Sequence, residues 1–228
     1  MTSKRLVQNS LESGLTIHYQ GNIILPILGM KISKALFMIN QVKNILPTDS
    51  LKTLYFAMIN PHICYQIMAW SNSTCAERGK IQKLKKKAIR TIHKASYTAH
   101  TDPLFKRSKI LKINDQQTYE SLLFMYDYNT HKLPHSFNNM YITNHDRNPQ
   151  VHTRQSNMLY IPRCDTNFLR HLPIYMYYLT RTWNLYLNTH PDTFKSRSIF
   201  KRDLKNELLS QYPVSVTCTN LRCRDCNM

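Results

Sequence analysis

The composition of this 228-residue chain is that of a folded and strongly basic protein. Hydrophobic residues make up 42 %, which excludes a disordered polyelectrolyte, and the length suffices for one large domain or two small ones. The formal net charge of +18 favours polyanionic partners, nucleic acid before an anionic membrane surface, and the low count of four glycines favours helices.

The N-terminal sequence and the cysteines predict an intracellular protein, in the nucleus or the cytoplasm, with no membrane partner. Residues 1–5 are polar, and the apolar run IILPIL is too short for a signal peptide or a membrane span. The six cysteines are irregularly spaced, which favours reduced thiols or a metal site over a disulfide framework.

Hydrophobic periodicity predicts a mainly α fold whose first clear pattern begins at Lys31. Residues 1–30 are weakly patterned and predict no firm structure. A helix over 31–46 ends before Pro47. A second helix, capped by Thr48 or Asp49, carries its apolar face over 51–58, and the run 63–70 is predicted to be buried.

Residues 80–94 predict an amphipathic helix that contains seven Lys or Arg residues and no acid. Its apolar side chains fall on one side at helical spacing: Ile81, Leu84, Ala88, Ile89 and Ile92. The opposite side carries positive charge: Lys83, Lys86, Lys87, Arg90 and Lys94. Lys85 lies in the apolar sector, and we expect its amine to extend past the apolar side chains into solvent.

The remaining pattern divides the chain into a helical bundle and a smaller C-terminal region. Asp102–Pro103 predicts the start of a short helix, and another begins near Asn114 or Asp115. Two more helices are predicted over roughly 170–187 and 196–211. The predicted organisation is a poorly defined segment (1–30), a helical bundle (31–134), a polar linker (135–157), a mostly helical region with little strand (158–212) and a cysteine-containing tail (213–228).

The carboxylates do not suggest a catalytic centre. Metal-assisted phosphoryl transfer needs clustered acids, whereas the 13 Asp and Glu residues are scattered and include no Asp-Asp pair and no Asp-x-Asp. A Gly-rich phosphate loop and the common hydrolase motifs are absent as well. We therefore assign no catalytic residue.

The last cysteines raise the question of zinc. Cys218, Cys223 and Cys226 form C-x4-C-x2-C, and three thiolates at this spacing could hold the ion. A tetrahedral site needs a fourth ligand, which Cys164, His171 or His190 would have to supply. The alternative is a tail with reduced thiols and no metal.

The basic helix and the segment after it predict a nucleic-acid-binding surface. Cations on one helical face can follow a phosphate backbone, and an aromatic side chain between them can stack on a base or contact a sugar. The candidate residues are Lys80, Lys83, Lys86, Lys87, Arg90, Lys94, Tyr97, Lys106, Arg107 and Lys109. The alternative is a solvated basic face without a ligand.

Several segments together resemble reverse transcriptases of non-LTR retrotransposons, the LINE and jockey-like group. They occur in the order and spacing of that family and cover about residues 31–212: KISKALFMINQVKNILP, LKTLYFAMINPHICYQIMAW, KIQKLKKKAIRTI, YTAHTDPLFKRSKILKIND, LLFMYDYNTHKLPHSF and RTWNLYLNTHPDTFKSRSIFKRDLKNELL. The sequence departs from the family at Gln66 and Leu179, where a glycine is usual.

The resemblance implies a thumb region and the region that follows it, without the palm that carries the catalytic Asp-Asp pair. Residues 80–94 would then contact an RNA or RNA–DNA template–primer. The missing palm and fingers would be further partners, and Mg²⁺ is expected only for a full-length polymerase. The alternatives are a stand-alone basic helical module derived from a mobile element, binding nucleic acid or protein, and a decayed product without function.

Overall fold

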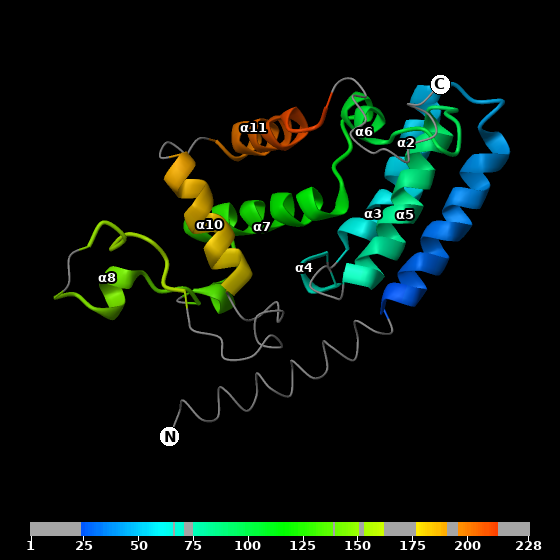
Figure 1. The fold of residues 1–228 in the computed structure, drawn as a ribbon. Coiled ribbons are helices and arrows are strands. Elements are labelled where there is room, and N and C mark those ends of the chain that lie inside the picture. Colours follow the sequence, from blue (N-terminus) through cyan, green and yellow to red (C-terminus); the bar gives the residue numbers. More distant parts are fainter. Residues whose placement is uncertain are drawn as a thin grey trace. The chain divides into compact units, whose positions relative to one another are not determined.

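The computed structural model describes residues 24–65, 67–70, 75–138, 140–150, 153–161, 177–190 and 196–213 (Figure 1). Helices dominate these segments, and the prediction of a mainly α fold is confirmed. Within them the strand-like pairing consists of one isolated antiparallel bridge, between Thr143 and Leu159. No helix in the described segments is both long and apolar enough to cross a membrane.

The helices follow the predicted order along the chain. A first helix spans 24–42. It is followed by α2 (Thr48–Met58), α3 (Asn60–Cys64), α4 (Ile67–Trp70), α5 (Cys75–Ile92), α6 (Asp102–Ser108), α7 (Ile113–Asn129), the 3-10 helix η1 (His135–Phe137), α8 (Asn144–Arg147), α10 (Tyr177–Thr189) and α11 (Arg197–Ser210).

The starts of the first helix and of α2 differ from the prediction. The first helix begins at residue 24, inside the stretch for which no firm structure was predicted, because Leu25 and Leu28 extend the buried stripe upstream. At α2, Pro47 occupies the N-cap position and no side chain caps the helix, so the prediction of a Thr48 or Asp49 cap was wrong. Asp49 lies in the first turn instead, where its charge favours the helix dipole.

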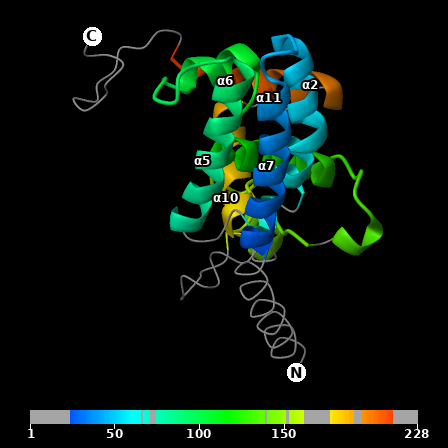
Figure 2. The ribbon, with the colours of Figure 1, turned by 90° about the vertical axis from the view of Figure 1, so that its right-hand side faces the viewer.

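The described residues form two compact units, divided within α7 and within α11. The first, called the α5 unit here, holds the described residues up to Gln116 and those from Asp203 onward. In it the first helix runs beside α2 and α5 (Figures 1 and 2), and α5 also packs against α6. Its core contains Ile32, Ile39, Leu51, Tyr55, Ile59, Ile63, Trp70, Ile89, Ile92 and Phe105.

The second unit, called the α10 unit here, holds the described residues from Gln117 to Arg202. The ring of Tyr126 stacks on that of Phe200, with the ring centroids 4.6 Å apart. The guanidinium of Arg197 donates two hydrogen bonds, of 2.7 and 2.8 Å, to the carboxylate of Asp127. Trp183 is 1 % exposed, so this tryptophan serves as a core anchor of the unit.

In the described segments, three helix ends are closed by residues in the left-handed backbone conformation, and none of the three is a glycine. Lys94, Lys109 and His131 have φ angles of 52°, 55° and 54°. After α6, the amide of Ile110 donates to the carbonyl of Phe105 and that of Lys109 to Lys106, which is the Schellman pattern. The left-handed conformation is unfavourable for a residue with a Cβ atom.

We expect Lys109→Gly to stabilise the protein by about 1 kcal/mol, because glycine adopts this conformation without the Cβ penalty. Urea unfolding would measure the change. Lys109→Ala is the matched control, since it removes the same charge and retains the Cβ atom, and we expect no gain from it. Equal stability changes in the two variants would contradict the prediction.

Candidate nucleic-acid interface

Helix α5 presents a buried stripe and an exposed basic stripe, as its periodicity predicts. The buried stripe consists of Ile81, Lys85, Ala88, Ile89 and Ile92. The exposed basic stripe, as we use the term, consists of Lys80, Lys83 and Lys87 on α5 and of Lys94, which follows the end of the helix by two residues. Because the buried stripe fixes the rotation of the helix against α2 and α6, the exposed lysines are held on one side and face solvent.

Lys85 contradicts the expectation that its amine reaches solvent. The residue is 0 % exposed, and its Nζ has no hydrogen-bond partner in the described part of the chain. It lies four residues after Ile81 and four before Ile89, in the middle of the buried stripe, so the side chain cannot pass its neighbours. Burial lowers the pKa of the amine from 10.5 to about 8, while Cys64 and Asp115 oppose this shift.

Arg90 and Tyr97 lie together at the end of α5. The Nε of Arg90 donates a 2.8 Å hydrogen bond to the carbonyl of Ala99, which ties the loop after α5 back to the helix. The guanidinium carbon lies 6.0 Å from the centroid of the Tyr97 ring. Tyr97 is 81 % exposed, so its ring presents an open face to solvent beside the cation.

The three cations predicted in and after α6 have different roles. The Nζ of Lys106 donates a 2.8 Å hydrogen bond to the carbonyl of Tyr212, just after the end of α11, and lies 3.5 Å from the carbonyl of Ser210. This ammonium therefore neutralises the negative end of α11. Arg107 and Lys109 are exposed, and neither is ion-paired with another described residue.

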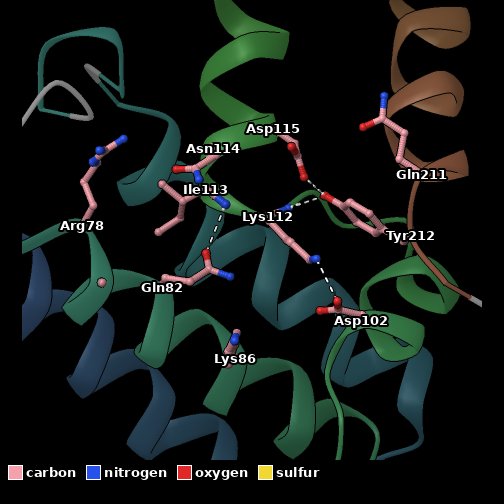
Figure 3. A pocket seen from close by; sticks show the side chains of 11 residues that line it. Arg78, Gln82, Lys86, Asp102, Lys112, Ile113, Asn114, Asp115, Gln211 and Tyr212 are labelled. Atoms are coloured by element: carbon pink, nitrogen blue, oxygen red, sulfur yellow. Dashed lines mark hydrogen bonds and ion pairs between the residues drawn. The ribbon is translucent and has the colours of Figure 1, made fainter. Parts of the chain in front are cut away.

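A polar pocket of about 520 Å³ lies in the same unit, beside α5 (Figure 3). Four segments separated in sequence form its walls: α5, the start of α6, the start of α7 with the residue before it, and the turn after α11. Its lining residues are Arg78, Gly79, Gln82, Lys86, Asp102, Lys112, Ile113, Asn114, Asp115, Gln211 and Tyr212. Of the residues predicted for nucleic-acid binding, only Lys86 lines this pocket.

Interactions between the lining residues hold the pocket together. The Oε1 of Gln82 accepts a 3.1 Å hydrogen bond from the amide of Ile113, and the Nζ of Lys112 lies 3.0 Å from the carboxylate of Asp102. The hydroxyl of Tyr212 accepts a 2.8 Å hydrogen bond from the amide of Lys112 and donates one to the carboxylate of Asp115. Burial, and then the Asp115 hydrogen bond, raises the pKa of the Tyr212 phenol.

Comparison with known proteins returns no relative for this chain. No protein-family model matches the sequence, and no curated protein or solved structure is similar to it. The resemblance to retrotransposon reverse transcriptases therefore rests on the sequence segments alone.

Sequence reasoning missed the pocket because the contacts that form it are long-range. Tyr212 contacts Lys112 and Asp115 across about a hundred residues of chain, and no local pattern marks that pairing. The predicted zinc ligands Cys218, Cys223 and Cys226 lie outside the described residues, as do Cys164 and His171.

Proposed function

We propose that this chain is the thumb region of a non-LTR retrotransposon reverse transcriptase with the region that follows it, and that α5 binds the template–primer. The observation that carries the proposal is the exposed basic stripe on α5. Three of its lysines, Lys80, Lys83 and Lys87, lie on the solvent-facing side of a helix that is anchored through its other side, and Lys94 is exposed just after the end of that helix. Ammonium groups held in a row suit a phosphate backbone, because binding them releases condensed counterions.

Eight of the ten candidate residues have a specific part in this proposal. Lys80, Lys83, Lys87 and Lys94 contact phosphates, and Arg107 and Lys109 extend this positive surface beyond α6. Tyr97 offers its exposed ring to a base or a sugar, next to the cation of Arg90. The partner is an RNA or an RNA–DNA duplex. Polymerisation would require the palm and fingers and their Mg²⁺, so the chain alone only binds.

The test is the salt dependence of binding to an RNA–DNA duplex, measured by fluorescence anisotropy. We expect the triple variant Lys80→Gln, Lys83→Gln, Lys87→Gln to lose affinity by on the order of 10-fold to 100-fold at physiological salt. The slope of log K against log salt should become flatter by about 2.7, because each lost phosphate contact contributes about 0.9.

The control is the variant Lys31→Gln, Lys34→Gln, Lys43→Gln, which removes the same charge from the first helix and its end. We expect it to leave the salt slope nearly unchanged. Wild-type affinity that does not weaken with salt would contradict the phosphate contacts and favour a module that docks on a protein. Template-dependent incorporation of dNTPs by this chain alone would contradict the assignment as a non-catalytic region.

A further inference from the structure

The polar pocket adjoins the exposed basic stripe through Lys86. This residue lies on α5 between Lys83 and Lys87, which face solvent, yet its own side chain is half-buried and lines the pocket. No described residue makes a hydrogen bond or an ion pair with its ammonium. The pocket thus has a cation positioned at the edge of the surface that we propose to follow a phosphate backbone.

The charges around the pocket favour an anion. Three cationic side chains line it, Arg78 and Lys86 from α5 and Lys112 before α7, and the ammonium of Lys112 lies 3.0 Å from the carboxylate of Asp102 (Figure 3). The other carboxylate, Asp115, accepts the hydroxyl hydrogen bond of Tyr212. Three cations against two carboxylates leave the lining with one net positive charge, which favours an anion.

The size of the pocket limits what can enter it. A volume of about 520 Å³ lies within the range of pockets that hold one small molecule, and one nucleotide unit fits that range. The exposed basic stripe has no such walls and can contact a continuous strand. We propose that the pocket receives the terminal nucleotide of a strand, with the phosphate that this nucleotide carries. The remaining phosphates of the strand then lie on the exposed basic stripe, so the inference rests on the proposed function.

The test compares three short single-stranded RNAs of one sequence, with a phosphate at the 5′ end, a phosphate at the 3′ end, or hydroxyls at both ends. Anisotropy with the full chain should show one phosphorylated RNA binding about tenfold more tightly than the hydroxyl form, the magnitude of one charge-assisted contact. Lys86→Gln should abolish this ratio. Lys87→Gln, the adjacent exposed lysine, should weaken all three RNAs and preserve the ratio.

A second variant separates the loss of the Lys86 charge from a possible folding defect caused by the substitution of Lys86. Gln211→Glu places a negative charge at the exposed edge of the pocket, opposite α5, and should also abolish the preference. The proposed site for a terminal nucleotide is overturned if both variants still bind the phosphorylated RNA more tightly than the hydroxyl form. It is also overturned if the wild type binds the three RNAs equally. If that equal binding still weakens with salt, the proposed function stands. If none of the RNAs or the duplex binds, both proposals fail.

Discussion

Replacing Lys85 with methionine is expected to stabilise the protein by about 3 kcal/mol at pH 7. The amine is fully buried and has no hydrogen-bond partner in the described part of the chain. Burial lowers its pKa from 10.5 to about 8, and each unit of this difference corresponds to about 1.4 kcal/mol against the folded state while the amine is charged. Methionine has a similar length and no charge, so it removes this cost. Urea unfolding at pH 7 measures the gain.

The stability of the wild type should also depend on pH in the direction that the lowered pKa of Lys85 dictates. Between about pH 8 and pH 10.5 the folded protein releases the Lys85 proton while the unfolded chain keeps it, so stability rises with pH in this window. From pH 7 to pH 9.5 the rise should be about 2 kcal/mol. Above pH 10 Tyr55 and Tyr212, whose pKa values are raised by burial, act in the opposite direction.

Lys87→Met is the matched control, because Lys87 lies on the exposed basic stripe two residues away. We expect it to change stability by less than about 0.5 kcal/mol and to retain the rise with pH. The Lys85→Met variant should lose that rise. A destabilised Lys85→Met variant, or an unchanged pH profile in it, would show that the amine is satisfied in the folded state.

Local periodicity predicts much of this fold, because the 3.6-residue repeat depends only on neighbours along the chain. Most of the helices lie close to predicted segments, and the buried side chains of α5 at Ile81, Ala88, Ile89 and Ile92 are the predicted ones. The short helices η1 and α8 lie within residues 135–157, for which no helix was predicted. The same local reasoning failed at Lys85. The helical repeat places Lys85 in the apolar sector of α5, as the structure does. How deeply this sector is buried depends on the helices that pack on it, which the repeat does not reveal.

The sequence does not show which cations of the candidate interface are hydrogen-bonded within the protein, because their partners lie elsewhere in the chain. Lys106 was grouped with Arg107 and Lys109 as a nucleic-acid contact, but its ammonium is bonded to the carbonyl of Tyr212. Arg90 is bonded to Ala99. A substitution of either residue would thus mix a binding effect with a folding effect. The lysines of the exposed basic stripe make no such contacts with other described residues, so their substitution reports on binding alone.

Asn184→Ala is expected to destabilise the protein by about 2–5 kcal/mol. The side-chain oxygen of Asn184 accepts a 3.1 Å hydrogen bond from the amide of Leu159, and its Nδ2 donates one of 2.8 Å to the carbonyl of the same residue. Both residues are buried, so alanine would leave one buried N–H and one buried C=O without a partner, each costing about 1–3 kcal/mol. Thermal or urea unfolding measures the loss.

The extended backbone around Leu159 explains why no other group can replace Asn184. The neighbouring Met158 carbonyl and Tyr160 amide pair with residues 144 and 142 on one side, so the polar groups of Leu159 point to the other side, toward α10. Asn188→Ala, one turn further along α10 at an exposed position, is the control and should leave stability unchanged or slightly raised. If Asn184→Ala behaved like Asn188→Ala, the pairing between Asn184 and Leu159 would contribute nothing to the fold.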